Sequence, residues 1–198
     1  MVGRFRKRSS GLKNLKKLVY LISPNEIYKD FYIDLKKVLA CNNVAFFQLR
    51  LKKTQEYKII IIAKKIQKIT KKYKIKFLIN DSSKIAKLIN ADGCHLGQKD
   101  GSAELERINL KNKIIGITCH NSKSLAKTAI KNKVDYLAFG SFNKSRLKPK
   151  AKKADLKILK WAKKNTNKPI VAIGGINNLN YKKLINAGAK YIAISSYI

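Results

Sequence analysis

The stretch Ile170-Val171-Ala172-Ile173-Gly174-Gly175 joins an uninterrupted apolar run to two glycines. A run that is apolar at every position predicts a β-strand covered on both faces, as in a parallel sheet. Glycines directly after such a strand predict a turn with bare backbone N–H groups, a frequent phosphate site in α/β barrels. The alternative is that these glycines only make a tight turn.

Seven further apolar, β-branched segments alternate with longer amphipathic ones, which is the pattern of repeated βαβ units. The expected strands are 18–22, 44–49, 76–79, 93–95, 113–117, 136–139, 170–173 and 191–194. The expected helices are 25–39, 54–73, 83–89, 103–108, 122–131, 155–165 and 178–187. Eight strands predict a closed (β/α)₈ TIM barrel of the α/β class, in a single domain. An open doubly wound sheet is the alternative.

Length and composition fit one soluble domain, because 198 residues with 45% hydrophobic side chains can bury a core unaided. We expect a basic, flexible extension over residues 1–13 and the barrel over residues 14–198. Cys41, Cys94 and Cys119 match no metal-binding spacing, and we expect free thiols in a reducing, cytoplasmic environment. No apolar run reaches the roughly 20 residues that span a bilayer, so we expect neither membrane insertion nor secretion.

The formal net charge of +34 comes from 45 Lys and Arg against 11 Asp and Glu. Such a charge suggests a nucleic acid or another anionic partner. The lysines are spread through nearly every segment instead of forming one arm or stripe, which indicates a general compositional bias. We therefore expect phosphorylated small molecules as partners and no specific nucleic acid. A basic nucleic-acid-binding protein is a remote alternative.

Polar side chains gather where the predicted strands end, which is where barrel enzymes carry their active sites. They are Gln48, Arg50, Lys52, Asn80, Asp81, His95, Gln98, Asp100, Thr118, His120, Ser141 to Lys148, Gly174, Gly175, Ser195 and Ser196.

Asp81 and Asp100 are scarce acids at the ends of adjacent strands, so they are placed to share a hard cation such as Mg²⁺. Either could instead be a local cap, Asp81 for the following helix and Asp100 for the turn into Gly101.

Arg50, Lys52 and Lys148 can neutralise diphosphate oxygens. Gln48 and Asn80 offer amide donors and acceptors suited to the edge of a heterocycle.

His95 and His120 are the only two histidines of the chain. Each is either a proton-transfer group or a hydrogen-bonded structural residue.

Taken together, these motifs resemble those of the thiamine phosphate synthases and, more broadly, of the superfamily that they form with the thiazole tautomerases. The resemblance runs from about Leu18 to Ile198. The stretches that carry it are Phe47-Gln48-Leu49-Arg50-Leu51-Lys52, Ile79-Asn80-Asp81, Ala91-Asp92-Gly93-Cys94-His95-Leu96-Gly97-Gln98-Lys99-Asp100, Gly116-Ile117-Thr118-Cys119-His120 and Val171-Ala172-Ile173-Gly174-Gly175-Ile176.

The resemblance implies a transferase that joins hydroxymethylpyrimidine diphosphate to thiazole phosphate by a dissociative, carbocation mechanism. It implies Mg²⁺ at Asp81 and Asp100. Arg50, Lys52, Lys148 and Thr118 would take part in catalysis, with Thr118 in place of the family's usual serine. The implied substrate-binding residues are Gln48, Arg50, Lys52, Asn80, Thr118, Ser145, Lys148, Gly175, Ser195 and Ser196.

The loop before Lys148 departs from the family pattern, which carries two threonines there. Ser145 can replace the first hydroxyl, whereas Leu147 cannot replace the second. One lost hydrogen bond costs on the order of 1 kcal/mol, so we expect weaker substrate binding. The nearest alternative is a thiazole tautomerase using His120 as its acid or base. Asp100 favours the synthase, because a tautomerase binds no metal diphosphate. A homo-oligomer is possible in either case.

Overall fold

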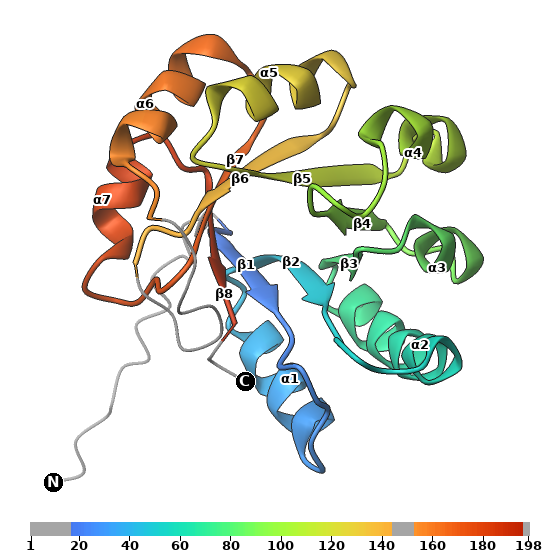
Figure 1. Ribbon diagram of the computed structural model, residues 1–198. Helices are drawn as coiled ribbons and strands as arrows, with labels where there is room; N and C mark the ends of the chain where they lie inside the picture. The colour runs from blue at the N-terminus through green and yellow to red at the C-terminus, as the bar shows by residue number, and fades with distance from the viewer. Residues whose placement is uncertain (1–16, 144–152, 196–198) are drawn as a thin grey trace, which may run out of the picture.

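The computed structural model describes residues 17–143 and 153–195, which form a closed barrel of eight parallel strands surrounded by seven helices (Figure 1). Each strand pairs with its neighbour in the sequence, and β1 pairs with β8 to close the barrel. The predicted TIM barrel is confirmed, and the open doubly wound sheet is wrong. The expected extension over residues 1–13 lies outside the described residues, so it stays a prediction.

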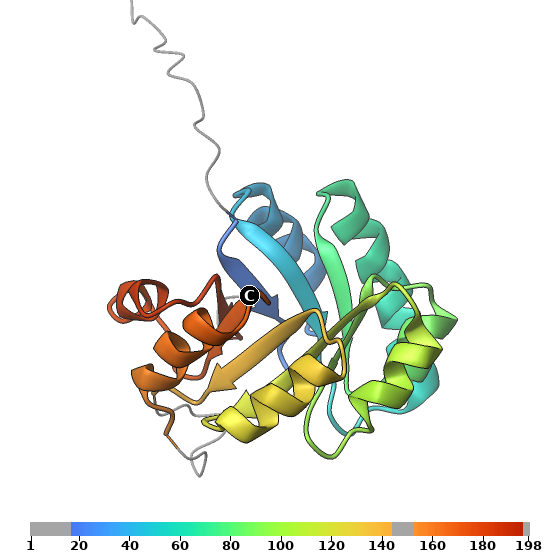
Figure 2. The same ribbon diagram turned by 90° about the horizontal axis from the view of Figure 1, so that it is seen from above.

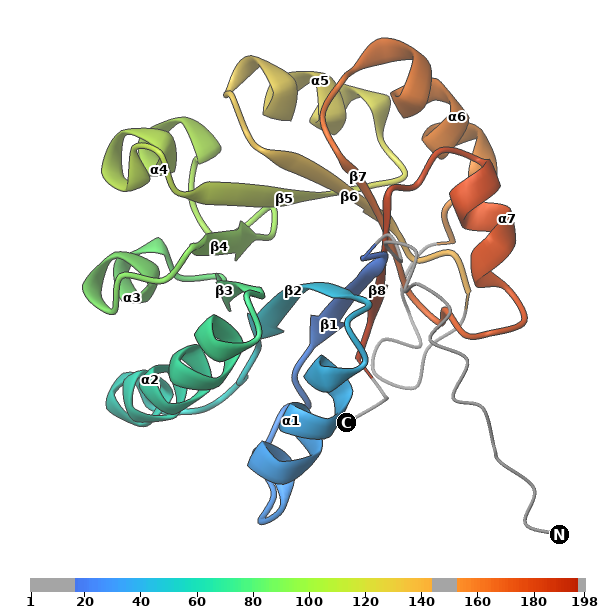
Figure 3. The same cartoon turned by 180° about the vertical axis from the view of Figure 1, so that it is seen from behind.

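The strands are β1 Val19–Ile22, β2 Val44–Leu49, β3 Lys76–Asn80, β4 Gly93–Leu96, β5 Ile114–His120, β6 Tyr136–Gly140, β7 Ile170–Ile173 and β8 Tyr191–Ile194. The helices are α1 Phe31–Ala40, α2 Glu56–Lys72, α3 Ser83–Leu88, α4 Ala103–Leu110, α5 Lys123–Lys131, α6 Leu156–Asn165 and α7 Tyr181–Asn186. Figures 1 and 3 show the helices on the outside of the strands from opposite sides, and Figure 2 shows α5 next to α6.

Two predicted helices begin at least three residues too early. The first starts at Phe31 instead of residue 25, where the buried series Phe31, Leu35 and Leu39 begins. The last starts at Tyr181 instead of residue 178. There the Asn180 side chain accepts a hydrogen bond from the Asn177 backbone, and so closes a turn that competes with the helix.

Apolar side chains form two separate cores. The larger lies between strands and helices, and the smaller, here called the interior cluster, fills the barrel. The interior cluster contains Tyr20, Ile22, Leu78, Tyr136, Ala138, Val171 and Ala193, with Phe46, Ile114, Ile173 and Tyr191 packed against it. Its rings pack closely: the centroids of Tyr20 and Phe46 lie 5.4 Å apart and those of Phe46 and Tyr191 5.1 Å. The barrel is therefore a filled core and not a pore.

Arg107 joins the loops at the end of the barrel where the strands begin. Its guanidinium donates to the carbonyls of Lys111, Lys113 and Lys133, and to the carboxylate of Asp135 at 2.5 Å. The same Asp135 oxygen accepts the backbone N–H of Ile115, at the start of β5. This end is thus fixed by charge-assisted hydrogen bonds. Among the residues described, no helix is both long and apolar enough to cross a membrane.

Candidate active site

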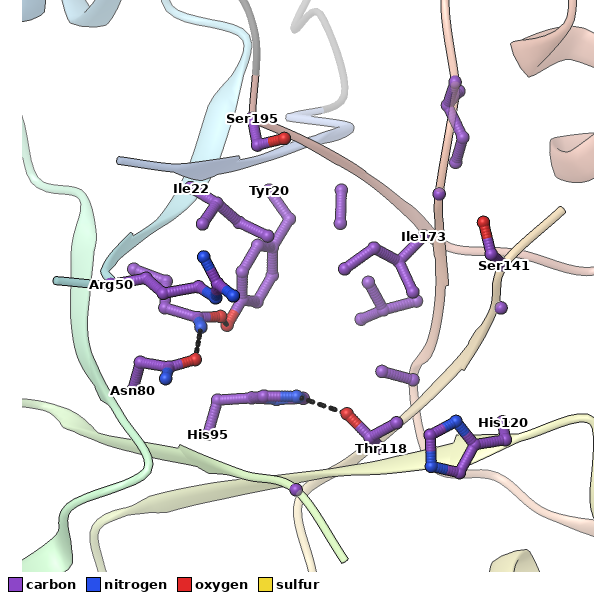
Figure 4. A pocket seen from close by; sticks show the side chains of 18 of the residues that line it. Tyr20, Ile22, Arg50, Asn80, His95, Thr118, His120, Ser141, Ile173 and Ser195 are labelled. Atoms are coloured by element: carbon purple, nitrogen blue, oxygen red, sulfur yellow. Dashed lines mark hydrogen bonds between the residues drawn. The ribbon is translucent and has the colours of Figure 1, made fainter. Parts of the chain in front are cut away.

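A cavity of about 890 Å³ lies at the ends of the strands, where active sites of barrel enzymes are found. Figure 4 shows it from close by. The predicted site residues that the structure describes all line it: Gln48, Arg50, Lys52, Asn80, Asp81, Asp100, Thr118, Gly175 and Ser195. Three others, Ser145, Lys148 and Ser196, lie outside the described residues, as does Leu147. The cavity lining also includes Lys153, which the sequence analysis missed.

Asp81 and Asp100 are neighbours at one side of the cavity. Burial raises the pKa of Asp81, and the neighbouring Asp100 carboxyl raises it further, whereas the Lys52 ammonium lowers it. Lys52 Nζ lies 3.6 Å from Asp81 Oδ2. Two crowded carboxylates that repel each other are a fitting donor set for a divalent cation.

The capping alternative is wrong for Asp81. Ser82 caps α3 instead, since its Oγ accepts the backbone N–H of Ile85 at 3.2 Å. Asp100 does make a local contact, because its Oδ2 accepts the backbone N–H of Gly97 at 2.8 Å. A Cβ at position 97 would lie 2.6 Å from that oxygen, so the glycine is what allows this approach. No group of three or more His, Cys, Asp or Glu side chains gathers into a metal cluster in residues 17–143 and 153–195.

Arg50 is held beside these carboxylates by the loop that follows β1. Its Nη1 donates to Asn25 Oδ1 at 2.6 Å, and its backbone N–H donates to Ser23 Oγ at 2.8 Å. Burial lowers the pKa of the guanidinium, while the Asp81 charge opposes that shift. The segment before α1 therefore positions Arg50.

Gln48 and Asn80 form one half of a chain of polar side chains beneath the cavity. The Tyr20 hydroxyl donates to Gln48 Oε1 at 2.6 Å, and Gln48 Nε2 donates to Asn80 Oδ1 at 2.5 Å. Figure 4 shows Tyr20 and Asn80 at the same side of the cavity. Gln48 is only 3% exposed, so this contact fixes its amide.

Thr118 forms the other half of that chain through His95. The Oγ1 of Thr118 lies 2.9 Å from His95 Nε2, and His95 Nδ1 lies 2.8 Å from the Tyr136 hydroxyl. A 2.8 Å contact between the hydroxyls of Tyr136 and Tyr20 joins the halves. We call the whole series the polar chain: Asn80, Gln48, Tyr20, Tyr136, His95 and Thr118. Both tyrosines were missed, because a tyrosine inside a strand is indistinguishable by pattern from any other core aromatic residue.

Gly174 and Gly175 follow β7 on the opposite side of the cavity. Both have positive φ, 103° and 57°. A Cβ at position 174 would lie 2.0 Å from Ser141 Oγ, so only glycine fits beside the β6 loop. With Ser195 after β8 on the same lining, this side offers backbone N–H groups and a hydroxyl to a phosphate. His120, by contrast, is exposed at the rim.

Comparison with known proteins decides the family. The family model described as thiamine monophosphate synthase matches residues 19–198. The chain belongs to this family. A thiamine-phosphate synthase of Pelagibacter ubique is 56% identical over 184 residues, which cover 92% of this chain and 89% of that one. A thiamine-phosphate synthase of Erythrobacter litoralis is 38% identical over 91% and 87% of the two chains.

The fold of the family agrees with the barrel described above. A solved structure of thiamine phosphate pyrophosphorylase from Pyrococcus furiosus superposes with a TM-score of 0.82 at 27% identity, and covers 92% of this chain and 87% of that one. The family that the sequence motifs predicted, the thiamine phosphate synthases, is thus confirmed.

Proposed function

We propose that the chain condenses hydroxymethylpyrimidine diphosphate with thiazole phosphate to give thiamine phosphate and pyrophosphate. The observation that carries this proposal is the pairing of Asp81 with Asp100 beside Arg50 and Lys52. Two carboxylates and two cations at one side of a cavity suit a diphosphate bound through a cation.

Asp81 and Asp100 would hold Mg²⁺, which when bound neutralises charge on the diphosphate. Arg50 binds diphosphate oxygens with a planar fork, and Lys52 acts as a point charge. Both oppose the negative charge that grows as the C–O bond to pyrophosphate breaks. The thiazole nitrogen then attacks the resulting pyrimidine methylene cation, and no general base is needed. Catalysis is positioning together with stabilisation of the leaving group.

The two substrates bind at opposite sides of the cavity. Gln48 and Asn80 hold the pyrimidine edge, and the Thr118 hydroxyl lies near the pyrophosphate. Gly175 and Ser195 hold the thiazole phosphate on the opposite side. Roles for Ser145, Lys148 and Ser196 stay predictions, because these residues lie outside the described ranges.

Mg²⁺ dependence, a cytoplasmic location, a possible homo-oligomer and the absence of a specific nucleic acid partner belong to the same proposal. They are carried over from the sequence analysis as parts of the proposal.

The test is turnover of purified protein with both substrates and Mg²⁺, following thiamine phosphate. We expect product from the wild type and a loss of at least about 100-fold in Asp100→Ala, the size typical of removing one transition-state electrostatic group. The matched control is Asp34→Asn, because Asp34 forms an exposed surface pair with Lys37. Folded wild-type protein that makes no product, but shifts a proton on the thiazole, would instead support a tautomerase.

A further inference from the structure

The polar chain crosses beneath the cavity, and each hydroxyl in it has a single proton to give. We propose that Tyr20 and Tyr136 are positioning residues that give this chain one direction. His95 then carries its proton on Nδ1, and Asn80 presents its Nδ2 donors to the ligand. This inference deepens the proposed function, since it concerns how the same site recognises the pyrimidine.

The direction follows from counting protons. Tyr20 donates its only proton to Gln48 Oε1, so it must accept at its contact with Tyr136. Tyr136 then donates its own proton to Tyr20 and must accept a hydrogen bond from His95 Nδ1. Burial raises the pKa of both tyrosines, so each hydroxyl keeps its proton at neutral pH.

The second ring nitrogen of His95 completes the sequence. If the ring carries a single proton and that proton is on Nδ1, Nε2 is an acceptor. In the ligand-free protein, Thr118 Oγ1, 2.9 Å away, is then the donor. Every bond in the polar chain therefore runs from Thr118 toward Asn80.

The sequence makes room for this arrangement at Gly116. His95, Gly116 and Tyr136 are register partners across β4, β5 and β6. A Cβ at position 116 would lie 1.8 Å from Tyr136 Cζ and 2.2 Å from its hydroxyl oxygen. The phenol ring crosses the space left by the missing side chain and stacks on His95, with centroids 5.6 Å apart and planes at 17°.

The consequence for a ligand lies at Asn80. Asn80 Oδ1 accepts a hydrogen bond from Gln48 Nε2. The Nδ2 group of Asn80 is then the donor that faces the cavity which Asn80 lines. An aminopyrimidine offers ring nitrogens as acceptors. The polar chain thus favours a heterocycle edge that accepts a hydrogen bond from Asn80 Nδ2, such as a ring nitrogen.

The direct test is the position of the histidine proton. The chain has two histidines, so ¹⁵N-histidine labelling gives two sets of signals in a long-range ¹H–¹⁵N correlation spectrum, and His120→Gln assigns them. In ligand-free wild-type protein at neutral pH we expect a single Nδ1–H tautomer for His95. A bare Nδ1 with the proton on Nε2, or a doubly protonated ring, overturns the proposal. Because no substrate is present, the result is independent of synthase activity.

Variants separate the tyrosines from general packing. Tyr136→Phe removes the acceptor for Nδ1–H, and we expect its His95 spectrum to lose the single tautomer. Tyr191→Phe is the matched control, since Tyr191 packs on the interior cluster outside the polar chain, and its spectrum should match the wild type. An unchanged spectrum in Tyr136→Phe contradicts the proposal, provided that thermal unfolding shows a folded variant.

Kinetics test the positioning role itself. In Tyr20→Phe and Tyr136→Phe we expect KM for the pyrimidine diphosphate to rise about five- to tenfold, the worth of one hydrogen bond. Neither kcat nor KM for the thiazole phosphate should change as much. If both variants keep the wild-type KM for the pyrimidine diphosphate, the tyrosines do not position the site.

Discussion

Asp81 is a half-buried carboxyl group with a second carboxyl against it and a backbone φ of +62°. Its raised pKa means that the folded state holds the Asp81 proton more tightly than the unfolded state does. The ionised group therefore weakens the fold at neutral pH. This cost is relieved as pH falls through the folded-state pKa toward the ordinary carboxyl value of about 3.9.

Asp81→Asn should consequently stabilise the ligand-free protein while destroying activity. Asparagine removes the repulsion and adopts positive φ readily. We expect a gain on the order of 0.5–1 kcal/mol in the free energy of unfolding at pH 7, kept small by solvent screening. Thermal unfolding with and without Mg²⁺ measures it. The gain should vanish toward pH 4, and added Mg²⁺ should raise the Tm of the wild type only. Equal Mg²⁺ stabilisation of both proteins would show that Asp81 is no ligand.

Gly116→Ala tests how tightly the interior cluster is packed. The added methyl group meets the ring of Tyr136, and overpacking of this kind costs about 1–3 kcal/mol. Urea unfolding measures the loss. In the double variant Gly116→Ala, Tyr136→Leu, the second change should restore part of the stability lost by the first. Additive losses would mean that the ring is not the obstacle.

At the scale of single residues, sequence patterns reveal charges and hydroxyls at strand ends but not their partners. Asp81, Asp100 and Arg50 could be placed on the cavity because strand ends converge in a barrel. Tyr20 and Tyr136 could not, since their role depends on which hydroxyls meet across strands far apart in the sequence.

Among the elements, β5 and β6 are tied at their starts by Arg107, which gives a stability prediction remote from the cavity. Arg107→Ala removes hydrogen bonds to three carbonyls and to Asp135. We expect a loss of about 2–3 kcal/mol in urea unfolding, because a carboxylate and carbonyls lose a charged donor. The exposed pair partner Lys37 is the control, and Lys37→Ala should change stability by less than about 0.5 kcal/mol. Equal effects would contradict the assigned role of Arg107.

Element order and type could be predicted because periodicity and apolar runs are local properties. Strands β2, β7 and β8 have the predicted bounds. The start of α1 could not be predicted, since the segment before Phe31 makes a contact with a residue far along the chain, from Asn25 to Arg50, that a local pattern does not reveal. Such a tertiary contact outweighs local propensity.

For the whole molecule, the net charge of +34 should act on encounter with anionic substrates. Long-range attraction raises association rates and is screened by salt. We expect kcat/KM for the pyrimidine diphosphate to fall about tenfold or more from low to high ionic strength, with kcat nearly constant at saturating Mg²⁺. Stopped-flow binding at several salt concentrations would locate the effect in the association rate. A salt-independent association rate would show that the charge plays no part in capture.

The interior cluster also determines from which side substrates can enter the cavity in the proposed reaction. Its packed rings form the floor of the cavity, so the cavity is closed inside the barrel and has its entrance at the strand ends. In the proposed function, the pyrimidine would lie against Gln48 near that floor, and the thiazole phosphate would lie nearer the entrance, at Gly175 and Ser195. The pyrimidine diphosphate would therefore have to bind first, and the thiamine phosphate would leave through the same entrance. The proposed reaction would then have an ordered sequence of substrate binding.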